Sequence, residues 1–471
     1  MSTLHAFTND ILGQLDGVGI AELIRKKEVT ALEVTEAAIA RSQKMDPSIH
    51  AISEDDYQRA LTIAKASSQK GFFSGVPTFI KDQSNYAGMA TRLGTKALEN
   101  ARVCKKSDGI TSQILDQGFI VLGKSTMPEF GWTAVTQFPN DWVPATCNPW
   151  NTAHTVGGSS GGSGALVAAG VVAISHTADG GGSTRIPASA CGLIGLKPTR
   201  ERLRRSKIME GSPIDISMDG VVTRSVRDTA YFYAEAEKFY HNKSMPKMGL
   251  VTGPTNRKLK MGYLYQSPTG SADDQTIAEL EKTIKLLTDL GHQLKPIDLP
   301  VSESFAADFE MTWKMSAWAT AKLGRFILDP SFDSKKLTDF THMLADEFKF
   351  AALPGTMKRM KGYKQEFSQV LKDNDIDIVL TPTLASAPRA LAQNVFDLSP
   401  KGHFDYLKSW AAFTPLASGT GAPSISLPMG FSADKNLPMG MLFNADFGQD
   451  ALLLELAYQI EQAQPWRRIT G

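Results

Sequence analysis

The sequence predicts an α/β fold in which helices surround a sheet. Short apolar stretches bounded by glycine and proline are typical of buried strands, as in VPTFIKD (76–82), GFIVLGKS (118–125) and VVAISHTAD (171–179). Helical stretches such as SDGITSQILDQ (107–117) separate them. No Pro/Gly/Ser-rich linker divides the chain, which favours a single domain over residues 1–471 rather than the roughly three domains that length alone would allow.

Residues 1–70 are predicted to form an N-terminal helical region of this domain. In TALEVTEAAIARSQKM (30–45), Glu33 follows Thr30 by three residues, which is the spacing of a capping box. Apolar residues then recur at helical spacing.

The second half of the chain continues the alternation. MGYLY (261–265) and HQLKPIDLP (292–300) have strand patterns. Between them a helix places Ile277, Leu280, Ile284 and Leu287 on one face and ends at Gly291.

Residues 302–372 hold few strand signals and several helical ones, including FEMTWKMSAWATAKLG (309–324), so we expect a helical insert near the substrate entrance. Two strands, IDIVLTPT (376–383) and APSISLPMGF (422–431), precede an amphipathic helix that begins at Asp450.

The bulk composition indicates a globular protein with a small-molecule partner. The 50 Lys and Arg residues balance 49 Asp and Glu, so no global field recruits nucleic acid or an anionic membrane. The basic stretch KPTRERLRRSK (197–207) is interpreted as solvated surface. Three cysteines without close spacing, and a first segment unlike a signal peptide, favour the cytoplasm.

No cofactor or metal is expected. GFIVLGKS matches a phosphate-loop pattern, but residues 119–122 are predicted to be the strand itself, so the match is attributed to chance. The eight histidines include no HExxH or other close metal-ligand pattern. His176 is expected to be a buried, hydrogen-bonded structural residue, and its position also allows a supporting role beside the next motif.

Two Gly/Ser tracts are the strongest indication of chemistry. GGSSGGSG (157–164) has the composition of a linker, but the apolar run that follows it predicts a buried helix leading into a strand, so the tract is expected to be a packed loop. DGGGSTRIP (179–187) begins where that strand ends, and its glycines can expose consecutive N–H groups beside Ser183. A hydroxyl beside such N–H groups suits acyl transfer.

Lys81 ends the apolar strand in GVPTFIKDQ (75–83) and is the candidate base. A lysine with the ordinary pKa of about 10.4 is protonated at neutral pH, whereas burial can lower that pKa by several units. The alternative is a surface lysine whose stem covers apolar groups.

These residues resemble the amidase signature family. The likeness lies in GVPTFIKDQ, GGSSGGSG and ADGGGSTRIPASACGLIGLKPT (178–199), with GFIVLGKSTMPEFG (118–131) and APSISLPMGFSADKNLPMGMLF (422–443) in the same order. It spans most of the chain and is weakest at 302–372. It implies a mixed β-sheet surrounded by helices and an amidohydrolase that acts on carbon–nitrogen bonds other than peptide bonds.

The resemblance assigns roles by position. Ser183 is implied as the nucleophile, Ser159 as the bridging serine after a cis peptide from Gly158, and Lys81 as the base. The N–H groups of Gly180, Gly181, Gly182 and Ser183 would form the oxyanion hole, while Asp179 and Arg185 would shape the loop or form an ordinary ion pair.

The family usually has Thr before this Asp and Thr or Ile after it, where this sequence has Ala178 and Gly180. One loop hydroxyl is therefore missing. The form HTADGGGS (176–183) is similar to that of 6-aminohexanoate cyclic-dimer hydrolases, which favours an aliphatic or cyclic amide as substrate.

The aromatic candidates for an apolar acyl pocket are Trp132, Trp313, Trp318, Trp410 and Phe413. Phe309 and Trp313, four residues apart on a helix, would more often be core residues. Trp313 and Trp318 are five residues apart and would point to different faces, so at most one is expected to reach a shared pocket.

Two other functions stay open. One is the A subunit of a glutamine-dependent tRNA amidotransferase, which would need partner subunits. The other is a non-catalytic binding protein on the same fold, against which the joint presence of Lys81, Ser159 and Ser183 argues. The expected partner is a small-molecule amide, with no nucleic acid and no membrane, and a homodimer is compatible with the sequence.

Overall fold

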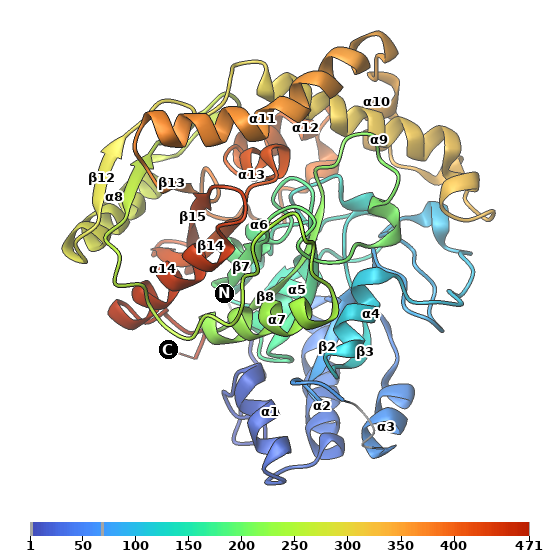
Figure 1. Cartoon of the computed structure of the whole chain (residues 1–471). Helices are drawn as coiled ribbons and strands as arrows, with labels where there is room; N and C mark the ends of the chain where they lie inside the picture. The colour runs from blue at the N-terminus through green and yellow to red at the C-terminus, as the bar shows by residue number, and fades with distance from the viewer. Residues whose placement is uncertain (1–2, 67–69, 471) are drawn as a thin grey trace.

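The computed structural model describes residues 3–66 and 70–470, in which helices and strands alternate along the chain (Figure 1). The helices are α1 Gly17–Arg25, α2 Ala31–Ile49, α3 Tyr57–Ala66, α4 Gly109–Asp116, α5 Gly161–Ala168, α6 Arg185–Cys191, α7 Val226–Phe239, α8 Asp274–Asp289, α9 Phe305–Ile327, α10 Asp339–Asp346, α11 Leu353–Asp373, α12 Pro400–Trp410, α13 Pro415–Thr420 and α14 Asp450–Ala463. The strands are β1 Ile52–Asp55, β2 Pro77–Lys81, β3 Ile120–Ser125, β4 Cys147–Asn148, β5 Asn151–Thr155, β6 Ile174–Asp179, β7 Ile194–Lys197, β8 Met218–Thr223, β9 Lys260–Tyr263, β10 Gln266–Ser267, β11 Gly270–Ser271, β12 Gln293–Pro296, β13 Ile378–Pro382, β14 Ser424–Ser432 and β15 Leu437–Ala445.

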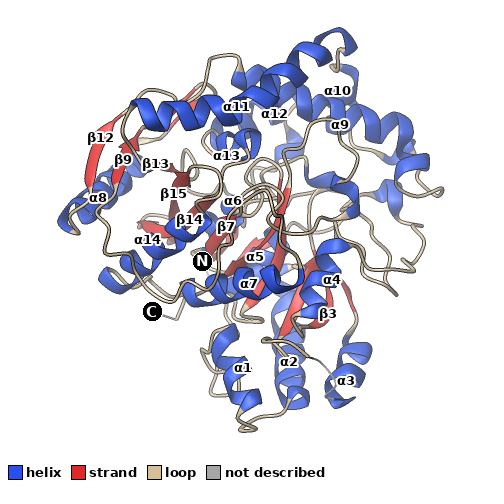
Figure 2. Cartoon of the chain, in the orientation of Figure 1, coloured by secondary structure: helices blue, strands red, loops and turns tan. Residues whose placement is uncertain are grey.

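An eight-stranded mixed sheet organises the molecule, with the strand order β12-β9-β13-β15-β14-β7-β8-β6. The strands β12, β9 and β13 pair in parallel, and the other pairs are antiparallel. Helices lie around the sheet (Figure 2). The predicted α/β class with a mixed sheet is confirmed. Strand β15, in the middle of the sheet, is missing from the sequence prediction.

A three-stranded sheet, with the order β1-β3-β2, places Lys81. Its strand β2 lies beside β6, because Thr78 Oγ1 donates to the Ile174 carbonyl at 3.0 Å and Ser175 Oγ donates to the Phe79 carbonyl at 3.3 Å. The last residue of β2 therefore lies next to the end of β6, where the Gly-rich loop starts.

The N-terminal helices α1, α2 and α3 lie together at the bottom of Figure 1. The capping box of α2 is confirmed: the Thr30 N–H donates to Glu33 Oε2 at 2.8 Å, and the Glu33 N–H donates to Thr30 Oγ1 at 3.2 Å. The first 70 residues are not wholly helical, however, since strand β1 interrupts them and pairs with β3. That pairing is a long-range contact, which helical spacing does not reveal.

Helices α9, α10 and α11 occupy residues 305–373, and they lie with α12 along the side of the molecule that is uppermost in Figure 1. The buried Glu129 fixes the start of α10, because its carboxylate accepts from the Thr338 N–H at 3.0 Å and from Thr95 Oγ1 at 2.8 Å. These hydrogen bonds connect α10 to the loop that follows β3.

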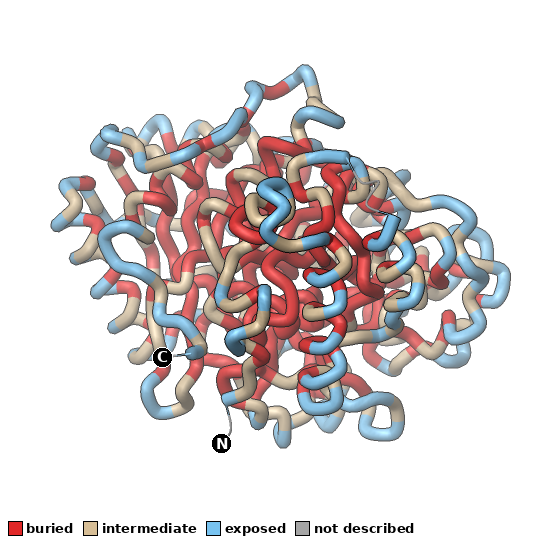
Figure 3. Tube along the Cα trace, turned by 90° about the horizontal axis from the view of Figure 1, so that it is seen from below, coloured by how far each residue is buried: buried red, intermediate tan, exposed pale blue. Residues whose placement is uncertain are grey.

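Buried residues fill the interior and exposed ones lie at the periphery (Figure 3). The predicted inner face of α8 is confirmed for two of its residues, because Leu280 and Leu287 are fully buried. The basic stretch 197–207 is not simply solvated surface. Lys197 and Arg202 are buried, and Arg202 forms ion pairs with Asp450 at 2.8 Å and Glu237 at 3.3 Å. These carboxylates are distant in sequence, so the charge run did not reveal them.

Candidate active site

Lys81 is fully buried at the end of β2. Its Nζ donates to Ser159 Oγ at 2.7 Å and to the Ala178 carbonyl at 3.4 Å. Burial lowers its pKa from the ordinary 10.5 to about 7, although the charges of Asp219 and Asp179 act in the opposite direction. The amine is therefore partly neutral near pH 7, and the surface-lysine alternative is wrong.

Ser159 lies in the packed loop that leads into α5, and the Gly158–Ser159 peptide is cis. Close neighbours explain the glycines around it. A Cβ on Gly158 would come within 2.8 Å of the Val135 nitrogen, and one on Gly131 within 2.8 Å of Ser159 Oγ. The tract is thus a tightly packed loop, as predicted from the apolar helix that follows it.

Ser183 lies in the loop after β6 and is only 7% exposed. Its carbonyl accepts from the Ser160 N–H at 3.3 Å, which joins the two serine-bearing loops. Ser159 and Ser183 line the same cavity. Within residues 3–66 and 70–470, no hydrogen bond connects their hydroxyl groups, so the Ser183 side chain is not yet engaged by Ser159.

The main-chain donors around Ser183 differ in availability. The Gly182 N–H donates to Asp179 Oδ1 at 2.8 Å, so the prediction that it contributes to an oxyanion hole is wrong for this geometry. In the described part of the chain, the N–H groups of Gly180, Gly181 and Ser183 have no acceptor. Thr414 Oγ1 donates to the Gly181 carbonyl at 2.6 Å and holds that peptide in place.

Asp179 and Arg185 shape the loop as expected. The two fully buried side chains pair through two hydrogen bonds, at 2.9 and 2.7 Å. Burial raises the pKa of Asp179, but the charge and hydrogen bonds of Arg185 outweigh burial and hold the pKa below its ordinary value. Arg185 also donates to the Thr414 carbonyl at 2.8 Å, so the pair links the loop to α13.

His176 has the structural role expected for it and also supports the lysine. Its Nδ1 accepts from the Lys81 N–H at 3.2 Å, and its Nε2 lies 3.0 Å from Asp219 Oδ1. Sequence reasoning missed Asp219 and Thr414. Neither lies in a motif with Lys81 or Ser183, so no local signal could have indicated them.

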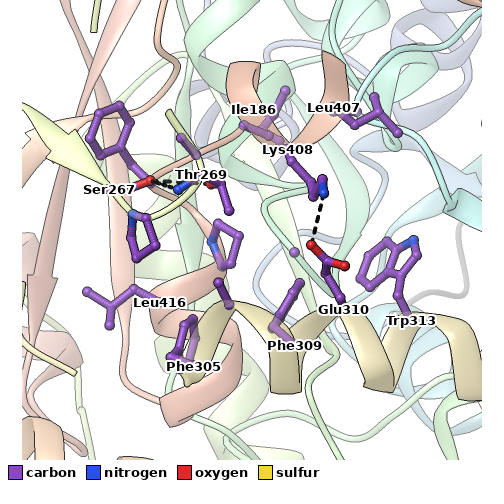
Figure 4. Close-up of a pocket in the computed structure, with 18 of the residues that line it drawn as sticks. Ile186, Ser267, Thr269, Phe305, Phe309, Glu310, Trp313, Leu407, Lys408 and Leu416 are labelled. Atoms are coloured by element: carbon purple, nitrogen blue, oxygen red, sulfur yellow. Dashed lines mark hydrogen bonds and ion pairs between the residues drawn. The ribbon is translucent and has the colours of Figure 1, made fainter. Parts of the chain in front are cut away.

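Two neighbouring cavities meet at Ser183. The first cavity is mainly apolar, and α9 and α12 supply much of its wall (Figure 4). The second cavity lies between α9 and the loop 207–217, and it also reaches Ser159. Gly131, Trp132, Trp313 and Ser183 line both cavities. Trp313 Nε1 donates to the Trp132 carbonyl at 3.2 Å, so these two residues form a shared wall.

The aromatic candidates divide between the cavities. Phe413 lines the first cavity and Trp318 the second. The expectation that only one of Trp313 and Trp318 reaches a shared cavity is wrong, because both line the second cavity, which extends around more than one face of α9.

Trp410 lines neither of these cavities. It is 3% exposed, and its Nε1 donates to the Ser386 carbonyl at 3.1 Å. Phe404, Leu407, Lys408 and Ala411 line the first cavity, so the face of α12 that carries Trp410 points away from it.

The remaining motifs point to other roles. Lys124 of the phosphate-loop match lies within β3, where its Nζ donates to Thr91 Oγ1 at 2.7 Å and lies 3.3 Å from Asp82 Oδ1. Across residues 3–66 and 70–470, no group of three or more His, Cys, Asp or Glu side chains could hold a metal ion. No helix in the described part of the chain is long and apolar enough to cross a membrane.

Comparisons with known proteins give one result. The family model described as Amidase matches residues 33–454. A putative amidase AmiC of Mycobacterium tuberculosis (strain CDC 1551 / Oshkosh) is 41% identical over 476 residues, which cover 100% of this chain and 98% of the relative. A 6-aminohexanoate-cyclic-dimer hydrolase of Pseudomonas sp. (strain NK87) is 31% identical, over 96% of this chain and 95% of the relative.

Solved structures agree. The structure of 6-aminohexanoate cyclic dimer hydrolase complexed with substrate superposes with a TM-score of 0.87 at 27% identity, covering 96% of this chain and 98% of that chain.

Proposed function

Because this chain belongs to the amidase signature family, we propose that it cleaves aliphatic or cyclic amides through an acyl-enzyme on Ser183. Members of this family are amidohydrolases of carbon–nitrogen bonds other than peptide bonds, and this chain is one of them. The observation that carries the proposal is the 2.7 Å hydrogen bond from Lys81 Nζ to Ser159 Oγ, inside a site that lowers the pKa of the lysine to about 7.

The proposed proton path runs through both serines. Neutral Lys81 accepts a proton from Ser159 while Ser159 takes one from Ser183, whose oxygen attacks the amide carbonyl. Hydrogen bonds of catalytic groups are often longer in the free enzyme and shorten when substrate binds, so the missing contact between the two hydroxyl groups is compatible with this path.

The N–H groups of Gly180, Gly181 and Ser183 would stabilise the oxyanion, since they are the donors without another acceptor. Losing one such donor typically costs on the order of 3 kcal/mol in the barrier. The proton that Ser159 returns goes to the departing nitrogen. The carbon–nitrogen bond then breaks, and water releases the acyl group from Ser183.

The proton path also orients the substrate. Because the departing nitrogen takes its proton from Ser159, that nitrogen faces Ser159, which lines only the second of the two cavities. The amine part would therefore occupy the second cavity and the acyl part the first. The apolar wall of the first cavity favours an aliphatic acyl chain. The relatives that hydrolyse 6-aminohexanoate cyclic dimer make that cyclic amide the first substrate to assay.

The test combines labelling with turnover. A fluorophosphonate is expected to modify Ser183 in the folded protein, and Ser183→Ala should lose both labelling and hydrolysis, the latter by on the order of 10⁴-fold or more. An unmodified Ser183 would favour a non-catalytic binding protein. Substantial turnover by Ser183→Ala would contradict the nucleophile assignment.

A substrate panel separates the activities left open. It should contain linear and cyclic aliphatic amides, esters, carbamates and glutamine. Faster turnover of aliphatic amides than of glutamine supports the proposal. Glutamine hydrolysis that depends on a copurifying partner would instead indicate an amidotransferase A subunit.

We further propose a cytoplasmic location and a small-molecule amide as the partner, without nucleic acid or membrane. Cys104, Cys147 and Cys191 are all free, which suits a reducing compartment. Sedimentation of the purified chain separates a monomer from the homodimer that the sequence leaves open.

A further inference from the structure

We propose that Glu310 makes the first cavity selective for acyl groups that carry a positive charge remote from the scissile amide. This inference rests on the proposed function, in which the first cavity holds the acyl chain.

Glu310 and Lys408 are the charged residues in the lining of the first cavity. Glu310 comes from α9 and Lys408 from α12, and Lys408 Nζ lies 3.0 Å from Glu310 Oε1. Figure 4 shows the two side chains meeting between these helices, beside Trp313. Their side chains are 26% and 28% exposed, so a ligand in the cavity can reach them.

The charges around this pair favour a cation over an anion. Glu310 also contacts Lys314 at 3.5 Å, Lys314 pairs with Glu347 at 2.9 Å, and Lys408 pairs with Asp405 at 3.3 Å. The five connected side chains hold one more carboxylate than ammonium groups. A carboxylate that approached Lys408 would therefore meet a net negative cluster, whereas an ammonium group would be attracted to it.

The aromatic lining acts in the same direction. Phe309, Trp313 and Phe404 all line the first cavity, and Lys408 Nζ lies 4.9 Å from the centre of the Phe404 ring. The faces of aromatic rings attract cations. Burial by itself lowers the pKa of Lys408, but Glu310 and Asp405 outweigh burial and raise that pKa, as expected where the local potential is negative.

An ammonium group on the acyl chain can thus replace Lys408 at Glu310. Lys408 would keep Asp405 as its partner, and Lys314 would keep Glu347. A substrate carboxylate that took the place of Glu310 at Lys408 would instead stay beside Asp405 and inside the net negative cluster, so the exchange favours the cation.

The test uses three series of p-nitroanilides that differ only at the far end of the acyl chain: methyl, ammonium or carboxylate, at chain lengths of four, six and eight carbons. All release the same amine, so kcat/KM reports acyl selection. At the best chain length we expect the ammonium substrate to exceed the carboxylate substrate by roughly fivefold or more. Glu310→Gln should bring this ratio close to one, and any change in kcat/KM for the methyl substrate should be smaller than the change in the ratio.

Asp405→Asn is the matched control. It removes one negative charge from the same cluster and from the same lysine, but Asp405 does not line the first cavity. We expect it to lower the preference by less than Glu310→Gln does, because Glu310, the group that the ammonium would contact, is still present. Equal losses in the two variants, or a loss in Glu310→Gln that is the same for all three substrates, would overturn a direct role of Glu310.

A binding measurement keeps this test independent of turnover. In Ser183→Ala, an amide with a terminal ammonium group should raise the Tm more than the matching amide with a terminal carboxylate. Equal shifts would refute the charge selection. If the anilides are hydrolysed but the ammonium and carboxylate substrates have equal kcat/KM values, only this inference fails. If no anilide is hydrolysed but the Tm shifts differ, the proposed function fails instead.

Discussion

Two parts of the site hold their polar groups in different ways. We call the ends of β2 and β6, with the loop that carries Ser183, the floor, and the helices α9 to α12 the cover. On the floor, Lys81 and Asp179 are fully buried, and each is hydrogen-bonded to fixed neighbours. In the cover, Glu310 and Lys408 are about a quarter exposed and belong to a chain of ion pairs between helices. Burial changes the chemistry of a group, whereas partial exposure leaves it able to exchange partners with a ligand. In the proposed function, this difference separates the groups that carry out catalysis from those that select the substrate.

The largest effect should come from removing the amine on the floor. Lys81→Met keeps the length of the side chain but deletes the base, so kcat should fall by on the order of 10³-fold for every substrate. The measurement is kcat over the amide panel. A loss confined to some acyl groups would mean that Lys81 contributes to substrate choice.

Lys197→Met is the matched control for Lys81→Met. Lys197 is also fully buried, and burial likewise lowers its pKa to about 7, but its Nζ donates to the Pro198 carbonyl and lines neither cavity. It should retain turnover. A comparable loss of kcat would show that any buried lysine near the loop is required, rather than the one bonded to Ser159.

The second effect is a pH dependence that belongs to the floor. Because only neutral Lys81 can accept a proton, kcat/KM should fall about tenfold for each pH unit below an apparent pKa of about 7. A profile over pH 5–9 tests this expectation, and Lys197→Met should leave it unchanged. An enzyme that is equally active at pH 5 and pH 8 would contradict the role of Lys81.

Stability should also depend on pH, and here both lysines contribute. Each has a folded pKa of about 7 and an ordinary pKa of 10.5. Between these values an unfolded lysine is protonated and a folded one is not, so the contribution of the two lysines to the free energy of unfolding should rise with pH from about 7 to about 10.5, and their full penalty applies below 7. Chemical denaturation should show a smaller slope in Lys197→Met, since one of the two groups is gone.

The smallest effect should come from the cover. Phe309 lines the first cavity and packs against Trp313 with tilted rings, whose centres are 5.6 Å apart. Phe309→Ala should lower kcat/KM by roughly tenfold for long acyl chains and little for acetyl amides, because only long chains lose apolar contact.

Phe350→Ala is the control for Phe309→Ala, since Phe350 is 58% exposed and lines the second cavity. It should alter selection of the amine part instead. Identical effects of the two variants on all substrates would contradict the division of the cavities between acyl and amine.

The sequence made the floor predictable because its signals are local. Lys81 ends an apolar strand, and Ser159 and Ser183 lie in glycine clusters that adjoin a buried helix and a buried strand. The cover was less predictable. Trp410 was chosen as an aromatic residue, yet it lies on α12, a helix that the sequence analysis did not predict, and the orientation of that helix decides that its face points away from the cavity. The N–H of Gly182 was assigned with its neighbours, but Asp179 accepts its hydrogen bond.

By itself, the sequence determined the α/β alternation and the packed serine loops, and its resemblance to the amidase family supplied the residues proposed for the chemistry. Only the tertiary structure decided which aromatic residues face a cavity and how Glu310 meets Lys408. The physical reason is range: strands, turns and caps depend on residues a few positions apart, whereas burial and pairing in this site join residues about 80 to 240 positions apart, such as Lys81 with Ser159 and Arg185 with Ser424.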